Sequence, residues 1–202
     1  MPTPRVWGGT TLADRQAERR QKLVGAGVDL LGEQDGVVSV RAACRRAKLT
    51  ERYFYESFAD RDALLIAVYE HVAEAARDTL VRAVARSEPE PEAMATAAVT
   101  AFVELILDDP RLGRVLLLGP MTEHALYDKG FEFTAVFAAL IREHLSPGID
   151  ADERDMIATS VVGAFTNLFI SYLNGTVRPR KERLVAHCVR LLLTIAEETP
   201  GA

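Results

Sequence analysis

The chain has 202 residues, of which 49% are hydrophobic and 26% are charged, so it can bury a substantial core as a soluble globular protein. Its two cysteines, Cys44 and Cys188, exclude a disulfide framework, and its first residues lack the apolar run of a secretory signal, so we expect a cytoplasmic protein. The net charge of −5 argues against binding to nucleic acid. Residues 1–62, however, carry 11 basic and 9 acidic residues, whereas the remainder carries 13 basic and 20 acidic residues, so the N-terminal part is the more basic one.

The first predicted helix covers residues 12–34, where apolar side chains recur at helical spacing. Gly36 follows it, and we expect this glycine to form a left-handed C-terminal cap. Ser39 is a good N-cap residue, and the apolar side chains after it are spaced i, i+3, i+4 and i+7. This pattern predicts a second helix of only two turns, over residues 40–47.

Thr50 is an N-cap residue for a third, short helix, in which Phe54 and Phe58 lie on one face. Asp60 can cap a much longer fourth helix over residues 61–86. The two short helices are joined by a tight turn at Lys48-Leu49, which is the arrangement that presents the second helix to the DNA major groove. Phe54 and Phe58 would then anchor this helix, while its other face projects outward.

The segment SVRAACRRAKLTERYFYESFADRDALL resembles the N-terminal domain of the tetracycline-repressor (TetR) family of bacterial transcription regulators. The resemblance covers about residues 12–70, and the matching signature positions are Tyr55, Phe58, Arg61, Asp62, Leu64 and Leu65. Lys48 stands where the family usually has a glycine, so this lysine must accept a positive φ or shift the turn. Arg61 replaces the usual lysine and keeps its charge.

The resemblance implies two sets of DNA contacts. Phosphate contacts fall on Ser39, Thr50, Tyr55, Ser57 and Arg61, and base-reading positions fall on Arg41, Glu51, Arg52, Tyr53 and Glu56. Either glutamate must accept a hydrogen bond from cytosine or pair with a neighbouring arginine, since otherwise it repels phosphate. The alternative interpretation of these charges is a solvated helix face.

The remainder of the chain predicts helices that are broken at Pro89 and Pro91, at Pro110, at Gly119-Pro120, at residues 146–150 and at residues 174–179. Residues 156–177 contain no charge. This stretch could span a membrane, but its many hydroxyl and amide groups favour a helix that is buried on all sides in a soluble protein.

The helix over residues 181–198 has a wide apolar stripe. The resemblance implies that the last two helices of each subunit form a four-helix interface in a homodimer. The candidate interface residues are Val161, Leu184, Cys188, Leu191, Leu192 and Ile195.

The inward face of the uncharged helix would meet two other helices that carry aromatic residues, which predicts an apolar ligand pocket or, alternatively, plain core. The candidate pocket residues are Phe102, Leu105, Ile106, Phe131, Phe133, Phe137, Phe165, Asn167 and Phe169. The four histidines show no metal-ligand spacing, and no nucleophile motif is present, so we expect neither a metal, a cofactor nor an enzyme.

We therefore expect an all-α protein with a helix-turn-helix DNA-binding domain at residues 1–70 and a helical ligand-binding and dimerisation domain at residues 71–202. Its partners would be an operator in double-stranded DNA, a small apolar effector and a second copy, without a membrane. Alternatives are an activator on the same fold, or a helical enzyme or lipid-binding bundle with a degenerate head. No motif in the sequence identifies the operator, the effector or the regulated genes. Nor does any motif show whether Cys44 or Cys188 senses the redox state.

Overall fold

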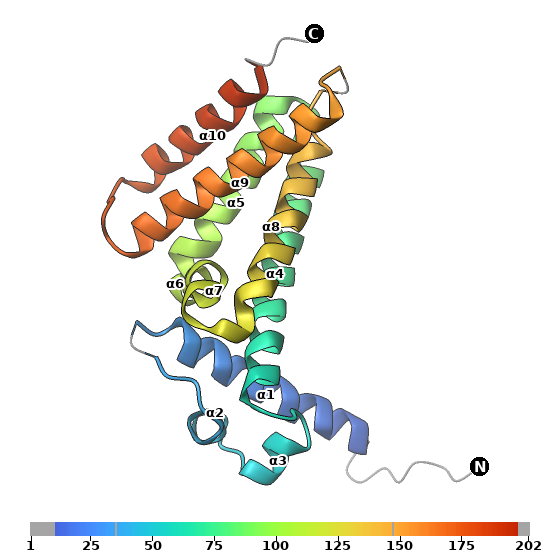
Figure 1. Ribbon diagram of the computed structural model, residues 1–202, viewed down its shortest axis with the longest axis vertical. Helices are drawn as coiled ribbons and strands as arrows, with labels where there is room; N and C mark the ends of the chain where they lie inside the picture. Colours follow the sequence, from blue (N-terminus) through green and yellow to red (C-terminus); the bar gives the residue numbers. More distant parts are fainter. Residues whose placement is uncertain (1–10, 35, 147, 198–202) are drawn as a thin grey trace, which may run out of the picture.

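The computed structural model describes residues 11–34, 36–146 and 148–197, and its described elements are all helices, as predicted (Figure 1). Two expectations lie outside the described residues. They concern the absence of a secretory signal at residues 1–10 and the end of the last predicted helix at Glu198. In Figure 1 the molecule is elongated, with α1, α2 and α3 at one end and the helices α5 to α10 at the other. We call these two parts the head and the body.

Helix α1 (Leu12–Gly32) begins with a capping box between Thr11 and Asp14. It ends at Gly32, and its C-cap residue Glu33 has an extended backbone, so the cap expected at Gly36 is wrong. At this end the helix packs closely on the body, because a Cβ atom on Gly32 would clash with the Cβ atom and backbone of Arg111. Only glycine lets the two segments approach this closely.

Helices α2 (Val40–Ala47) and α3 (Glu51–Tyr55) form the predicted helix-turn-helix. The hydroxyl oxygen of Ser39 accepts a hydrogen bond from the Ala42 amide at 3.1 Å, as an N-cap should. Lys48 has φ 56° and ψ 43°, and the Leu49 amide donates to the Cys44 carbonyl at 2.9 Å, so the turn closes as a left-handed C-cap. The lysine thus takes the conformation that glycine usually supplies.

Helix α4 (Arg61–Ala85) begins at Asp60, whose carboxylate accepts a hydrogen bond from the Ala63 amide at 2.8 Å. It starts in the head and continues into the body (Figure 1). The domain boundary expected near residue 70 therefore falls inside a helix that belongs to both parts. Phe54 and Phe58 are buried in the same hydrophobic cluster as Leu64, Leu65 and Tyr69 of α4.

The body begins with α5 (Pro91–Asp108), followed by α6 (Pro110–Gly113), the π-helical turn η1 (Arg114–Leu118) and α7 (Gly119–Thr122). Helical backbone therefore runs through Gly119-Pro120, and the break expected there is wrong. A proline lacks an amide hydrogen and clashes with the carbonyl four residues earlier. The wider π turn immediately before Pro120 accommodates this residue, and the helical run ends only at Glu123.

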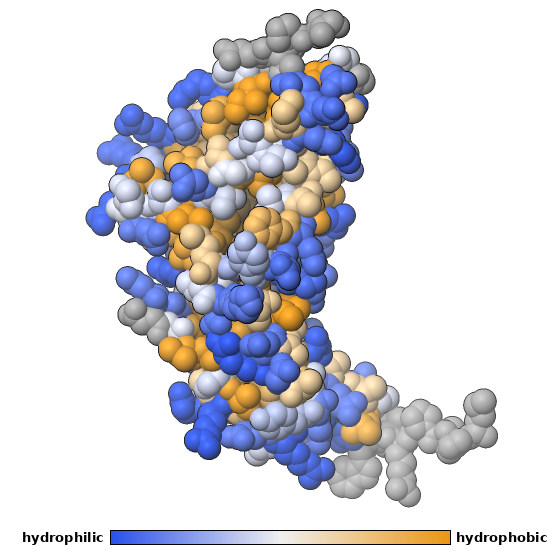
Figure 2. Space-filling model, in the orientation of Figure 1, coloured by the Kyte–Doolittle hydropathy of each residue, from blue (hydrophilic) through white to orange (hydrophobic). Residues whose placement is uncertain are grey.

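The short 3₁₀ turn η2 (His124–Leu126) leads into α8 (Tyr127–Arg142), α9 (Ala151–Leu173) and α10 (Lys181–Glu197). Helix α9 is long and apolar enough to cross a membrane by length and composition, and 22% of its most apolar window is buried in the chain. The expectation that neighbours surround α9 is therefore wrong for a single chain. Figure 2 shows a pale band, neither strongly hydrophilic nor strongly hydrophobic, where Figure 1 places this helix.

Candidate DNA-binding surface and ligand cavity

The outward face of α2 and α3 carries two arginines that extend into solvent. The side chains of Arg41 and Arg52 are 89% and 85% exposed. Each lies beside a glutamate, since Arg41 is 3.5 Å from Glu51 and Arg52 is 3.2 Å from Glu56. Both glutamates therefore have the neighbouring arginine that the sequence required of them, and exposed ion pairs of this kind exchange partners at little cost.

Tyr53 and Tyr55 are exposed on α3, with 37% and 58% of their surface accessible. The Arg19 guanidinium of α1 lies 4.4 Å from the centre of the Tyr53 ring and so supports it from behind. The exposed Thr50 makes no capping bond with its hydroxyl group, whereas the Ser57 hydroxyl donates to the Tyr53 carbonyl at 3.0 Å. Ser39, at the start of α2, is half-buried and acts as its N-cap.

Arg61 differs from its predicted role as a phosphate clamp. Its Nε atom donates to the Val38 carbonyl at 2.7 Å, and its Nη2 atom lies 2.6 Å and 2.7 Å from the two carboxylate oxygens of Glu123. The Glu123 side chain is 18% exposed and precedes α8 in the body. Arg61 thus joins the head to the body, and we do not assign it to the DNA-contacting surface.

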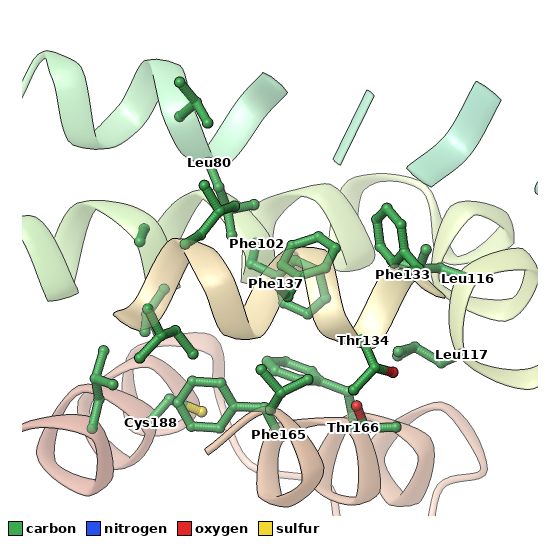
Figure 3. Close-up of a pocket in the computed structure, with 18 of the residues that line it drawn as sticks. Leu80, Phe102, Leu116, Leu117, Phe133, Thr134, Phe137, Phe165, Thr166 and Cys188 are labelled. Carbon is green, nitrogen blue, oxygen red and sulfur yellow. The ribbon is translucent and has the colours of Figure 1, made fainter. Parts of the chain in front are cut away.

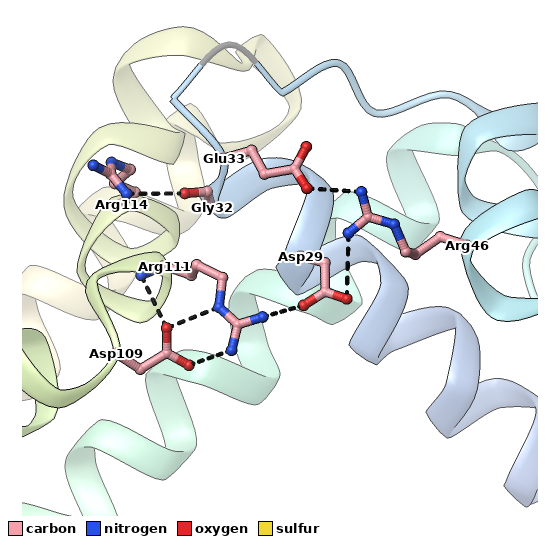
Figure 4. Close-up of polar contacts among 7 residues, drawn as sticks. All are labelled: Asp29, Gly32, Glu33, Arg46, Asp109, Arg111 and Arg114. Carbon is pink, nitrogen blue, oxygen red and sulfur yellow. Dashed lines mark hydrogen bonds and ion pairs between the residues drawn. The ribbon is translucent and has the colours of Figure 1, made fainter.

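A second set of charges joins the two parts beside α6 (Figure 4). The Asp29 carboxylate in α1 accepts a hydrogen bond from Arg111 of α6, and it lies 3.5 Å from Arg46 of α2. Arg46 also donates to Glu33 at 2.7 Å, and Arg114 donates to the Gly32 carbonyl at 3.3 Å. The position of α6 is therefore coupled to both α1 and α2.

The body contains a cavity of about 810 Å³ between α4, α5, α8, α9 and α10 (Figure 3). Six of the nine predicted pocket residues line it, all of them phenylalanines: Phe102, Phe131, Phe133, Phe137, Phe165 and Phe169. A volume of this size is typical of sites for drug-sized molecules. The aromatic residues of the body thus line a cavity as well as a core.

The other three predicted pocket residues do not line the cavity. Ile106 is 1% exposed in a core cluster, Leu105 packs against the cluster shared with the head, and Asn167 points to solvent from α9. Each lies on a helix that does contribute to the cavity, but on another face of it. Helical spacing alone did not indicate which face turns inward.

Sequence reasoning missed several lining residues from four helices: Tyr69, Leu80, Thr134, Thr166 and Cys188. Figure 3 shows Thr134 and Thr166 on α8 and α9, at the end of the cavity where Leu117 lies. Each threonine directly follows a lining phenylalanine and precedes another by three residues, a pattern that could have identified both. Tyr69 and Leu80 carried no comparable signal, because α4 was interpreted as the support of the head.

The cavity wall is built around a continuous row of aromatic rings. Ring centres are separated by 5.9 Å for Tyr69 and Phe133, 4.4 Å for Phe133 and Phe137, and 6.2 Å for Phe137 and Phe102. Phe102 continues the row to Phe169 at 5.0 Å. All four contacts are edge-to-face, the arrangement that aromatic rings favour. The row connects α4 with α9 across the body.

One side of this wall also belongs to the core of the head. Tyr69 and Leu116 line the cavity, and both are buried in the hydrophobic cluster that contains Phe54 of α3 and Leu23 of α1. Phe133 and Phe137 pack against the same cluster. Since cores are closely packed, a displacement of these side chains is transmitted to their neighbours.

The predicted interface residues divide into two groups. Val161, Leu184 and Cys188 are at most 1% exposed within a single chain, so they have no surface to offer a second copy. Leu192 lines the cavity, while Leu191 and Ile195 are half-buried. Apolar spacing on α9 and α10 thus marked the inner face of these helices more often than the outer one.

The exposed face of α9 consists of small or uncharged residues at helical spacing: Met156, Thr159, Ser160, Gly163, Ala164 and Asn167. A Cβ atom added to Gly163 would meet no atom within 4 Å, which confirms that this residue faces outward. An exposed helix face normally carries charged side chains. From Met156 to Asn167 this face consists of uncharged residues, and it is therefore suited to close contact with another helix.

Both cysteines are buried, and burial raises the pKa of each thiol, that of Cys188 to about 11. A thiol must lose its proton before it reacts with oxidants or disulfides. The buried, protonated state of Cys44 and Cys188 argues against redox sensing by either residue.

Comparison with known protein families gives a match over the body. The profile of the tetracyclin repressor-like C-terminal domain family matches residues 90–194, slightly more than half of the chain. No curated protein sequence matches the chain.

Among solved structures, the fatty acid degradation regulator FadR from Bacillus halodurans is similar, with a TM-score of 0.73, 15% identity and coverage of 87% of this chain and 94% of that chain. A transcriptional regulator from Rhodococcus sp. Rha1 has a TM-score of 0.70 and 17% identity, covering 87% of this chain and 95% of that one. The multidrug binding protein EbrR complexed with imidazole has a TM-score of 0.65 and 20% identity, with coverages of 86% and 94%. At these identities the likeness shows the fold.

Proposed function

The chain belongs to the tetracycline repressor-like (TetR) family of transcriptional regulators, and from this premise we propose that it represses transcription as a ligand-responsive dimer. In this proposal, two heads bind a pseudo-palindromic operator, and a small apolar molecule in the cavity of the body releases them. The DNA contacts come from Arg41, Arg52 and Tyr53 toward base edges, and from Thr50 and Tyr55 toward phosphates.

The observation that carries the proposal is the hydrophobic cluster that the head and the cavity share. Phe54 of the recognition helix α3 and Tyr69 of the cavity wall are buried in one cluster, on helices separated by a single short turn. A ligand that displaces Tyr69 or Leu116 must move α4 or the turn η1 against the head. The charged contacts at Asp29 and Arg61 link the same two parts, so the angle of the head follows the state of the cavity.

Dimerisation is required because α3 is only five residues long and one such helix reads too few base pairs. The uncharged outer face of α9 supports a two-fold contact with a second copy. Its threonine, serine and asparagine side chains can hydrogen-bond across such a contact, and lipid would offer them no partner. We therefore infer that a second subunit covers this face.

Selection of bound sequences from a random DNA pool tests the function. We expect enrichment of inverted half-sites whose centres lie one helical turn or a multiple of it apart. Fluorescence anisotropy on the selected duplex then measures binding, with and without small apolar molecules. Enrichment of no sequence, or of single half-sites only, would overturn the proposal of a two-headed operator-binding regulator.

A further inference from the structure

We propose that the cavity binds a neutral, elongated apolar molecule that carries a hydrogen-bond-accepting oxygen at one end, and that Tyr69 donates the hydrogen bond to this oxygen. The proposal rests on the proposed function, since it names the class of molecule that would release the operator. It excludes carboxylates and quaternary ammonium compounds of the same length.

The first argument is the charge of the wall. Among the described residues that line the cavity, none is a lysine or an arginine, and the only ionised side chain is that of Glu143, which is exposed with its neighbour His144. A carboxylate buried here would leave water without gaining a cation. An ammonium group could pair only with Glu143, whose exposed carboxylate offers little stabilisation because exposed ion pairs are weak. The wall therefore selects neutral molecules.

The second argument is the hydroxyl group of Tyr69. Tyr69 is only 3% exposed and lines the cavity, and its hydroxyl makes no hydrogen bond with any residue that the structure describes. Tyr69 is almost fully buried as a residue, but its hydroxyl oxygen is not among the buried atoms without a partner and so keeps accessible surface, where a ligand or a water molecule can supply the missing hydrogen bond. Burial also raises the pKa of Tyr69, so the phenol keeps its proton and acts as a donor at physiological pH.

The third argument is the asymmetry along the cavity. Tyr69 lies in the first half of α4, the half nearer the head, and Figure 3 shows Thr134 of α8 and Thr166 of α9 at the end of the cavity where Leu116 and Leu117 lie. The Thr134 hydroxyl donates to the Gly130 carbonyl at 2.9 Å, which leaves its lone pairs free to accept. Toward the opposite end, α4 contributes Leu80 and Val84, and the polar side chains there, those of Glu143 and His144, are exposed to solvent. A ligand with one polar end would therefore point this end toward the head.

The test is a displacement assay with the full chain and the neutral fluorescent dye N-phenyl-1-naphthylamine. The competitors for the cavity are decanone, decanol, decanoate and decyltrimethylammonium. They are chosen because they share one chain length and differ only in the polar end. Tyr69→Phe removes only the hydroxyl group, and Tyr172→Phe is the matched control, because Tyr172 does not line the cavity. Dye binding by both variants verifies that the cavity is intact.

We expect decanone and decanol to displace the dye. Decanoate and decyltrimethylammonium should bind the cavity with an affinity lower by about a hundredfold or more. Tyr69→Phe should lower the affinity for decanone by about five- to tenfold, which is the effect of one neutral hydrogen bond, and Tyr172→Phe should leave this affinity unchanged. Equal competition by decanoate or the ammonium compound, an unchanged affinity of Tyr69→Phe for decanone, or no displacement by decanone would overturn the proposal.

Binding of the selected DNA duplex is measured on the same samples to separate the two hypotheses. Decanone that binds through Tyr69 without releasing DNA would support the ligand class and contradict ligand-responsive repression. Release of DNA by decanoate but not by decanone would contradict the ligand class and leave the repressor function standing.

Discussion

Arg61 and Glu123 form a bidentate ion pair across the junction of head and body, with the Nη2 atom of Arg61 at 2.6 Å and 2.7 Å from the two carboxylate oxygens. They are 62 positions apart in the sequence. Removal of Arg61 leaves the Glu123 carboxylate without this partner, and removal of Glu123 leaves the Arg61 Nη2 atom without it, although Arg61 keeps its bond to the Val38 carbonyl. We expect Arg61→Ala and Glu123→Ala each to lower the free energy of unfolding by about 2 kcal/mol.

Urea denaturation of both variants and of the double variant measures this coupling. The double variant should lose less than the sum of the two single losses, because the second substitution removes a group that has already lost its partner. Asp62→Ala is the control, since Asp62 lies 3.1 Å from the same guanidinium but is 60% exposed. Strict additivity of the two losses would mean that the pair contributes nothing to the junction.

Lys48 offers a test of backbone strain, because its left-handed conformation is unfavourable for a residue with a Cβ atom. Lys48→Gly should raise the free energy of unfolding by about 1 kcal/mol. Ala47→Gly, one position earlier and at the last residue of α2, should lower it instead, because glycine is a poor helix former. Two variants that both destabilise the protein in urea would show that the Lys48 side chain contributes more than its conformation costs.

Arg41 is expected to read a base, since its side chain is almost fully exposed on the outward face of α2. Arg41→Ala should weaken binding to the selected duplex by about 1 to 3 kcal/mol and relax the preference at one or two positions of each half-site. The exposed Arg190 of α10 provides the control. Anisotropy titrations on single-base variants of the duplex measure both effects, and an equal loss on every sequence would assign Arg41 to the phosphate backbone instead.

The outer face of α9 predicts the state of assembly. Static light scattering should show a dimer at micromolar concentration in the absence of DNA and ligand. Ala164→Arg places a charge in the centre of the uncharged face, near its own copy across the two-fold axis, and should produce monomers that bind the operator weakly. Ala75→Arg adds the same charge to an exposed position of α4 and should leave the dimer intact. A wild-type monomer would contradict both the interface and the two-headed mechanism.

Cys188 predicts a specific dependence of stability on pH. Its pKa is raised from an ordinary value of 9.0 to about 11, so between these values the unfolded chain releases the thiol proton and the folded chain keeps it. The contribution of the neutral thiol is fully present below pH 9 and decreases as the pH rises toward 11. Cys188→Ala should therefore flatten the alkaline decrease of the free energy of unfolding, and parallel curves for the two proteins would contradict the assignment.

Several elements follow from local signals alone. Ser39 and Asp60 cap α2 and α4 through hydrogen bonds to amides three residues away, so the residues that determine these boundaries are neighbours in the sequence. The all-α fold and the helix-turn-helix follow from such caps and from apolar spacing. For Lys48 the sequence left two alternatives, a positive φ or a shifted turn, and the structure shows the first.

The tertiary structure decided what depends on distant neighbours. The charge of Arg61 was apparent from the sequence, but its contact with Glu123 of the body was not, because the two residues are far apart in the chain. Val161 and Ala164 are three residues apart on α9, yet one is buried and the other exposed. An apolar or uncharged helix does not specify its rotation about its own axis. The packing of α8, α9 and α10 around the cavity sets that rotation, and with it the residues available to a ligand or a second subunit.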